Sequence, residues 1–341
     1  MTEFNKAVTP SDTLHVYEHL TPDVVLDALA SVGLYGDGRL MALSSYENRV
    51  YQVTLENGER VVTKFYRPER WSAAQILEEH AFAADLMAAE VPAVGPLVLN
   101  GKTLHPHSGF MFSVSPWRGG RQPELDDFEV LEWIGRFLAR IHTVGSAKPF
   151  VHRPALDLHS YGSEPHDWLL AHEIIPLDMQ SSWRSACEQA LSLIGGHGHT
   201  AHGPDRLHLK DAAMVRLHGD CHPGNILWTP LDEWGRGGPH FVDLDDARMG
   251  PAVQDLWMML GGGERHERLS QLAELMDGYQ EFHDLHPREL ALIEGLRSLR
   301  LMHYSAWLAR RWDDPAFPMS FPWFGSERYW GEQILILREQ M

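Results

Sequence analysis

The chain has 341 residues, of which 44% are hydrophobic, so it is long enough to form two lobes with substantial cores. Its formal net charge of -18 argues against broad nucleic-acid binding, because phosphate backbones attract surfaces rich in Lys and Arg. No apolar run reaches the length of a membrane span, about eighteen residues, and the N-terminus lacks the pattern of a signal peptide, so we expect a cytoplasmic protein that does not bind membranes.

A β-hairpin is predicted near the N-terminus, where two β-rich runs, residues 49–55 and 60–66, flank Asn57-Gly58. Lys64 lies in the second run. A lysine in an apolar strand ordinarily packs its stem and directs its ammonium group to solvent at a sheet edge. Neither of the Gly-rich phosphate-binding motifs occurs in the chain. The polar turn at residues 43–49 is either an ordinary turn or a weaker phosphate contact made through hydroxyls and backbone amides.

A capping box at Ser72 predicts a helix over residues 73–90. The helical period places Glu79 on the apolar stripe and Glu78 on the opposite, solvent-facing side. A buried carboxylate needs a partner, and we expect that partner to be Lys64. Such a pair of strand lysine and helix glutamate orients the lysine toward nucleotide phosphates in kinases.

A stretch rich in Gly, Pro and Arg begins at Ser115 and reads as a hinge, so we divide the chain into an N-lobe, residues 1–114, and a C-lobe, residues 115–341. Residues 127–144 are predicted to be helical, with Gly145 as the stop. The later part of the chain also has a helical period. We therefore expect an α+β fold, in which a small antiparallel-sheet lobe with one main helix precedes a larger, mostly helical lobe.

The most informative motif is His-Gly-Asp-Cys-His-Pro-Gly-Asn at residues 218–225, followed by Phe-Val-Asp-Leu-Asp-Asp at 241–246. A His-Gly-Asp sequence alone is ordinary turn chemistry. The spacing of Asp220, Asn225 and Asp243, however, matches a kinase catalytic centre. There, one carboxylate accepts the proton of the attacking hydroxyl, while the amide and the second carboxylate hold Mg²⁺ against the nucleotide phosphates.

Short apolar runs flank this motif at residues 215–217, 226–228 and 240–244. The last two read as strands joined across a polar, Gly-rich turn. Such a hairpin brings the three site residues to one edge despite their separation in sequence. A calcium loop starting at Asp243 is excluded, because Arg248 stands where that loop requires glycine.

The two cysteines, Cys187 and Cys221, form no disulfide framework, which suits a reducing cytoplasm. Cys221 follows the predicted base, and we favour a small residue in a packed loop over a redox switch. A Gly-rich stretch contains three histidines, which we interpret as a solvated loop in preference to a metal site: His197, His199 and His202.

The motif at 218–225, with Val-Asp-Leu-Asp-Asp and Gly-Pro-Ala-Val-Gln-Asp-Leu-Trp after it, resembles the branch of the protein-kinase-like superfamily that includes aminoglycoside phosphotransferases and choline kinases. More closely, the chain resembles the bacterial stress response kinase A family. The matching stretches lie at 45–51, 64–71, 76–80 and 312–318.

This resemblance implies an ATP- and Mg²⁺-dependent serine/threonine protein kinase that also phosphorylates itself, with a protein substrate and a role in stress response. We expect a monomer. The implied catalytic residues are Asp220 and Asp243, and the implied Mg²⁺ ligands are Asn225, Asp243 and Asp245. The implied nucleotide-binding residues are Ser45, Lys64 and Glu79, and Asp255 is implied to brace the catalytic loop.

Two alternatives remain at this point. The same centre can serve a small-molecule kinase acting on an aminoglycoside-, choline- or homoserine-like alcohol, and an acidic C-lobe would suit cationic acceptors. A non-catalytic nucleotide-binding scaffold is the other possibility. The presence of Asp220 beside Asn225, Asp243 and Lys64 argues against a scaffold, because a scaffold has no need of a proton acceptor.

Overall fold

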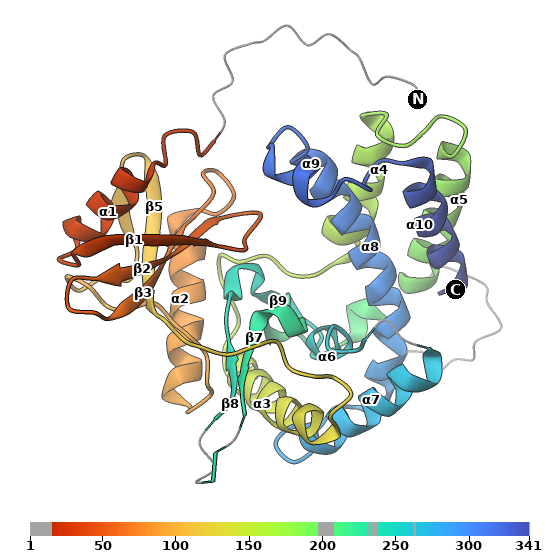
Figure 1. Cartoon of the computed structure of the whole chain (residues 1–341). Helices are drawn as coiled ribbons and strands as arrows, with labels where there is room; N and C mark the ends of the chain where they lie inside the picture. Colours follow the sequence, from red (N-terminus) through yellow and green to blue (C-terminus); the bar gives the residue numbers. More distant parts are fainter. Residues whose placement is uncertain (1–15, 197–207, 231, 234–236, 262–263, 341) are drawn as a thin grey trace, which may run out of the picture. The chain divides into compact units, whose positions relative to one another are not determined.

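The computed structural model describes residues 16–196, 208–230, 232–233, 237–261 and 264–340 (Figure 1). The chain divides into two compact units: unit 1 takes the described residues up to Trp71 together with Val98–Val114, and unit 2 takes Ser72–Leu97 and the chain from Ser115 onward. One border thus falls at the predicted lobe boundary, while residues 72–97 belong to unit 2. The assignment of nucleotide and acceptor roles to the two predicted lobes stays a prediction. The predicted loop with its three histidines lies outside the described residues.

Unit 1 is a five-stranded sheet in the order β1-β2-β3-β5-β4, together with helix α1 (Pro22–Ser31). The β1–β2, β2–β3 and β4–β5 pairs are antiparallel. Its apolar core includes stacked rings of Phe65 and Phe112, with centroids 5.4 Å apart. The strands are β1 (Gly36–Leu43), β2 (Arg49–Leu55), β3 (Arg60–Phe65), β4 (His105–His107) and β5 (Phe110–Pro116).

The predicted hairpin is confirmed as β2 and β3. Gly58 has φ +84°, a left-handed conformation that costs glycine little, and the side chain of Asn57 accepts a hydrogen bond from the N–H of Glu59. The turn chemistry of Asn-Gly therefore fixes the register in which Val50 pairs with Lys64.

Unit 2 is mostly helical (Figure 1). Helix α3 packs against α7, and α8 lies against α4, α5 and η1. The α-helices are α2 (Ala73–Ala88), α3 (Phe128–Ser146), α4 (Glu164–Ala171), α5 (Gln180–Ile194), α6 (Val253–Trp257), α7 (Arg265–Tyr279), α8 (Ile293–Arg310), α9 (Ala316–Ser320) and α10 (Glu327–Glu339). The short helical turns are η1 (His159–Ser163), η2 (Leu209–Asp211), η3 (Pro223–Asn225), η4 (Leu244–Asp246) and η5 (Pro287–Leu292).

Helix α2 confirms the predicted capping box, with Ser72 and Gln75 capping each other. Its buried apolar residues include Ile76, Phe82 and Leu86. Helix α3 corrects one expectation: Gly145 does not stop the helix, which runs on to Ser146. A Cβ at Gly145 would lie 2.3 Å from the carbonyl oxygen of Arg216, so this glycine permits the close approach of strand β6.

Two small antiparallel sheets complete unit 2. Strand β7 (Ile226–Thr229) pairs with β8 (Gly238–Phe241), as the predicted hairpin requires, although β8 ends at residue 241, before the predicted limit of 244. Strand β6 (Val215–Leu217) pairs with β9 (Arg248–Gly250), a pairing that sequence analysis did not predict. Asp243 therefore lies beyond the end of β8.

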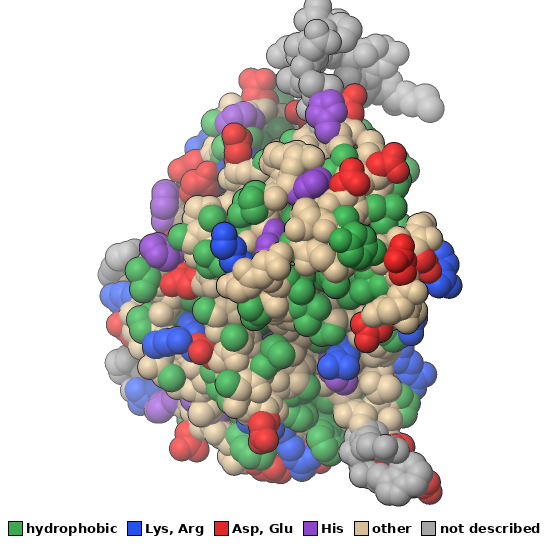
Figure 2. All heavy atoms as spheres, turned by 90° about the vertical axis from the view of Figure 1, so that its left-hand side faces the viewer, with side chains coloured by type: hydrophobic (Ala, Val, Ile, Leu, Met, Phe, Trp, Pro, Cys, Tyr) green, Lys and Arg blue, Asp and Glu red, His purple; other side chains and the backbone are tan. Residues whose placement is uncertain are grey.

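The distribution of charge can be followed on one face of the molecule. On the face shown in Figure 2, acidic side chains lie scattered among basic and apolar ones, without a single acidic patch. Within the ranges that the structure describes, no helix combines the length and apolar character needed to cross a membrane. The α+β fold class, with a small antiparallel sheet and a larger helical part, is confirmed.

Candidate active site for phosphoryl transfer

The catalytic motif forms the loop between β6 and β7, and its first residues are fixed by Asp255 of α6. The carboxylate of Asp255 accepts hydrogen bonds from the N–H groups of His218 (2.8 Å) and Gly219 (2.9 Å). Gly219 has φ +86°, and a Cβ there would lie 2.1 Å from the carbonyl oxygen of Asp246. Only glycine fits this turn, and the predicted bracing role of Asp255 is confirmed.

Asp255 is fully buried and needs partners of its own. His142 of α3 lies 3.1 Å from one Asp255 oxygen, and its other ring nitrogen is 2.8 Å from the hydroxyl of Tyr279 in α7. Burial by itself would raise the pKa of Asp255, but the bonds with His142 and Gly219 outweigh it and lower that pKa. The carboxylate is therefore ionised, and it ties the loop to two long helices.

Asp220, the predicted base, is partly exposed, with 22% of its side chain accessible. Its Oδ1 accepts a hydrogen bond of 2.6 Å from Nη2 of Arg300 in α8. Its Oδ2 lies 3.6 Å from Nε2 of His222, beyond ordinary hydrogen-bond range. Burial opposes the charge of Arg300, but Asp220 and neighbouring acidic groups outweigh it and raise the pKa of Arg300.

Asn225 is hydrogen-bonded to the backbone of Asp220 and to that of Val242, the residue before Asp243. Its Nδ2 donates to the carbonyl oxygen of Asp220 at 2.9 Å, and its own carbonyl oxygen accepts from the N–H of Val242 at 3.0 Å. His218 adds a bond from Nε2 to the carbonyl oxygen of Val242 at 2.9 Å. The structure thus brings Asp220, Asn225 and the residue next to Asp243 into one hydrogen-bonded arrangement.

Asp243 has φ 60° and ψ 62°, a left-handed conformation that is uncommon outside glycine and that turns the chain as it leaves β8. The residue is exposed. Asp245 is only 3% exposed and lies in η4, and the carboxylate of Asp246 pairs with Arg248 at 2.8 Å. Among these three acids, Asp243 is the one most open to a ligand.

The donor set suits Mg²⁺. Because Asn225 uses its side-chain N–H on Asp220, its Oδ1 is the side-chain atom left for a cation, and the exposed carboxylate of Asp243 offers further oxygen atoms. In the described part of the chain, no three His, Cys, Asp or Glu side chains form a metal-binding group by themselves. Mg²⁺ sites in phosphotransferases need few protein ligands, since phosphate oxygens and water complete the coordination. The ligand roles of Asn225, Asp243 and Asp245 stay predictions.

Helix α2 places Glu79 on its buried face, as predicted, but pairs it with a residue that sequence analysis missed. Arg153, which has no exposed side-chain surface, donates to Glu79 at 3.3 Å and to the carbonyl oxygens of Gln75, Asp245 and Ala247. Lys64 lies on β3 of unit 1, with Nζ 5.1 Å from the ring centroid of Tyr66. Pairing of Lys64 with Glu79 stays a prediction.

The expectation that Glu78 points to solvent is wrong. Its carboxylate accepts hydrogen bonds from three successive backbone N–H groups, those of Val151, His152 and Arg153. Burial would raise the pKa of Glu78, but these bonds outweigh it and lower the pKa. Both glutamates therefore hold the segment that carries Arg153. Ser45, in the turn between β1 and β2 of unit 1, is half-buried, and its contact with nucleotide stays a prediction.

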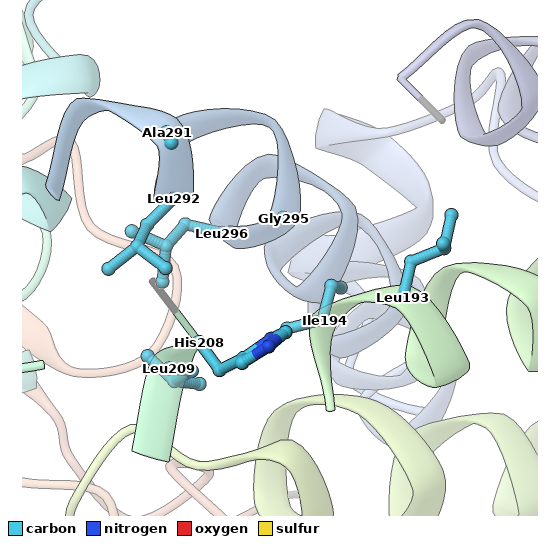
Figure 3. A pocket seen from close by; sticks show the side chains of 8 residues that line it. All are labelled: Leu193, Ile194, His208, Leu209, Ala291, Leu292, Gly295 and Leu296. Atoms are coloured by element: carbon cyan, nitrogen blue, oxygen red, sulfur yellow. The ribbon is translucent and has the colours of Figure 1, made fainter. Parts of the chain in front are cut away.

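Cys221 is fully buried, and burial raises the pKa of its thiol well above the usual value, with further contributions from Asp255 and Asp220. The packed-loop interpretation of Cys221 is confirmed. A small pocket elsewhere in unit 2 has no acidic lining residue that could hold a cation, so it is not the phosphotransfer site (Figure 3). Its lining consists of Leu193, Ile194, His208, Leu209, Ala291, Leu292, Gly295 and Leu296.

The chain is similar to known phosphotransferases and kinases. Residues 40–293 match the family model of the phosphotransferase enzyme family. The chain is 45% identical over 330 residues to stress response kinase A of Escherichia coli (strain K12), covering 97% of this chain and 95% of that protein. It is 44% identical, over the same shares of both chains, to the serine/threonine protein kinase RdoA of Salmonella typhimurium (strain LT2).

Solved structures share the fold at low identity. An amicoumacin kinase in complex with AMP-PNP and Ca²⁺ superposes with a TM-score of 0.69 at 19% identity, covering 93% of this chain and 92% of that one. A spectinomycin phosphotransferase gives 0.62 at 14% identity, covering 93% and 98%. Fold and site therefore define a phosphotransferase with a protein-kinase-like fold. The chain belongs to the phosphotransferase enzyme family and, within it, to the stress response kinase A family.

Proposed function

We propose that this protein is an ATP- and Mg²⁺-dependent kinase that phosphorylates serine and threonine hydroxyls of proteins, itself included, as part of a cytoplasmic stress response. The observation that carries the proposal is the hydrogen-bonded arrangement of Asp220, Asn225 and Val242, the residue before Asp243. It supplies a carboxylate for proton transfer next to oxygen donors for a cation.

In this mechanism Asp220 accepts the proton of the acceptor hydroxyl while the hydroxyl oxygen bonds to the γ-phosphorus of ATP. Asn225 and Asp243 would hold Mg²⁺, with Asp245 as a further ligand. Bound there, Mg²⁺ would neutralise charge on the phosphates. Asp255 keeps the loop in shape through the N–H groups of its first two residues.

On the nucleotide side, Lys64 is the proposed phosphate contact and Ser45 a neighbour of the nucleotide. Glu79 is the proposed partner of Lys64, and it is already held in place by Arg153. If Lys64 and Arg153 both bind the buried carboxylate of Glu79, a movement of α2 would move Lys64. It would also move the segment before Asp246, because Arg153 binds the carbonyl oxygen of Asp245.

Two observations bear on the acceptor. The relatives at 44–45% identity are named as stress response or serine/threonine protein kinases, which favours a protein acceptor. The solved structures with the same fold are, by their names, kinases of small molecules such as amicoumacin and spectinomycin. A small alcohol is therefore the second candidate acceptor.

The deciding experiment is incubation with γ-labelled ATP and Mg²⁺ in three arms: the protein alone, with a generic protein acceptor, and with a panel of small aminoalcohols. We expect label on the protein itself in all three arms and on the generic acceptor in the second, and none on the aminoalcohols of the third. Label on an aminoalcohol alone would replace the protein-kinase proposal by a small-molecule kinase. Absence of label in all three would remove phosphoryl transfer as the proposed function.

A further inference from the structure

The predicted base, Asp220, is held by an arginine from a distant part of the chain. Arg300 stands in the middle of α8, and its Nη2 lies 2.6 Å from Oδ1 of Asp220. The two residues are 80 positions apart in sequence, and Arg300 lies outside the motif at residues 218–225. The contact therefore depends on how α8 packs against the catalytic loop.

The two carboxylate oxygens of Asp220 differ in their surroundings. Oδ1 accepts the short, charge-assisted bond from Arg300. Among the described residues, no hydrogen bond reaches Oδ2, and Nε2 of His222 lies 3.6 Å from it. An ion pair thus occupies one oxygen and leaves the other to accept a proton.

A second arginine of this region is bonded to a different acid. Arg248 of β9 binds Asp246 at 2.8 Å, and its guanidinium lies 4.9 Å from the ring centroid of Tyr161 in η1. Arg300 is the arginine that is hydrogen-bonded to Asp220.

The side chains of Asp220 and Arg300 are partly buried, with 22% and 27% of their surfaces exposed. The bond between them orients the Asp220 carboxylate directly, because an arginine presents a planar, permanently charged group in a fixed orientation.

We propose that Arg300 is a positioning residue for phosphoryl transfer: it holds Oδ1 of Asp220 and so makes Oδ2 the oxygen that receives the proton. In that step the O–H bond of the acceptor breaks, and the proton goes to Oδ2. The acceptor oxygen bonds to the γ-phosphorus of ATP, and the bond from that phosphorus to the bridging oxygen of ADP breaks. The inference rests on the proposed function above.

The test compares Arg300→Ala with Arg297→Ala, measured as phosphate transfer to the acceptor found for the wild type. Arg297 lies one turn away on α8, is 29% exposed, and binds Glu294 instead of the catalytic loop. We expect Arg300→Ala to lower kcat by about 10–100-fold, the effect of a misplaced catalytic group, with an unchanged KM for ATP. Arg297→Ala should keep the wild-type kcat.

Added guanidinium ion should restore part of the kcat of Arg300→Ala and none of that of Asp220→Asn. Arg300→Gln, which keeps most of the side-chain volume, provides the same comparison if the alanine variant folds poorly. In the Asp220→Asn background, Arg300→Ala should cause no further loss.

Three results would overturn the role of Arg300 alone: wild-type kcat in both Arg300 variants, a raised KM for ATP with normal kcat, or a full further loss in the Asp220→Asn background. The proposed function is tested separately by the wild type. If the wild-type protein transfers no phosphate to any acceptor, both the function and the role of Arg300 are overturned.

Discussion

Glu79 of α2 and Arg153 form a buried ion pair with an N–O distance of 3.3 Å, and Arg153 also donates to the carbonyl oxygens of Asp245 and Ala247. Helix α2 is thereby joined to the segment that follows Asp243, and Arg153 is the residue that connects the two within unit 2.

Removing either member of this pair should destabilise the fold. Glu79→Gln and Arg153→Met should each lower the free energy of unfolding by roughly 3–5 kcal/mol, because the remaining charge is buried without its partner. The double variant should cost less than the sum of the two. Urea unfolding measures all three, and additive losses would show that the two residues do not interact.

Glu78→Gln should also be destabilising, by about 1–2 kcal/mol, since the carboxylate accepts three backbone N–H bonds but is partly exposed. Glu90→Gln, an exposed change just past the end of α2, is the matched control and should leave the unfolding midpoint unchanged. Equal midpoints for the two variants would mean that the bonds to residues 151–153 are of no energetic consequence.

Asp220→Asn should cut turnover by roughly 10²–10⁴-fold, the usual contribution of a general base, with little change in nucleotide affinity. Asp211→Asn, in the exposed turn η2, is the control and should retain full turnover. Initial rates with labelled ATP and nucleotide binding by calorimetry give the two quantities. Near wild-type turnover in Asp220→Asn would assign proton transfer to another group.

Asp243→Ala should weaken the Mg²⁺-dependent part of ATP binding as well as turnover, because Asp243 is the most exposed of the three clustered acids. Titration of ATP with and without Mg²⁺ separates the metal-dependent part from the rest. Asp232→Ala, an exposed aspartate outside the motif, should bind as the wild type does. Unchanged metal dependence in Asp243→Ala would place the ligands elsewhere.

Local signals in the sequence were sufficient for much of the fold. The capping box at Ser72, the Asn57-Gly58 turn and the spacing of Asp220 and Asn225 each lie within a few residues, where backbone geometry is decided by neighbours. Gly145 shows the limit of such signals, since its role depends on the close approach of β6. In the sequence, a glycine that ends a helix and a glycine that permits a strand to approach look the same.

The partners of the site residues lay beyond sequence reasoning. Arg153 is 74 positions from Glu79, Arg300 is 80 from Asp220, and His142 is 113 from Asp255. No periodic pattern links residues so far apart, because their proximity follows from helix packing. The orientation of Glu78 was missed for the same reason: a helix face that looks polar in sequence is covered here by the backbone of residues 151–153.

The final prediction concerns Asp255, whose buried carboxylate anchors the catalytic loop. Asp255→Asn should lower the free energy of unfolding at pH 7 by roughly 3–5 kcal/mol, because it removes the charge that the N–H groups of His218 and Gly219 and the ring of His142 surround.

The dependence of this loss on pH has a definite sign. The pKa of Asp255 is lowered in the folded state, so its contribution to stability is fully present above the unfolded value of about 4 and disappears as the pH falls through the lower, folded value. The difference between the wild type and Asp255→Asn in urea unfolding should therefore be largest at neutral pH and shrink below about pH 4. A difference that stays constant from pH 7 down to the acid range would mean that packing, and not the ionised carboxylate, holds the loop.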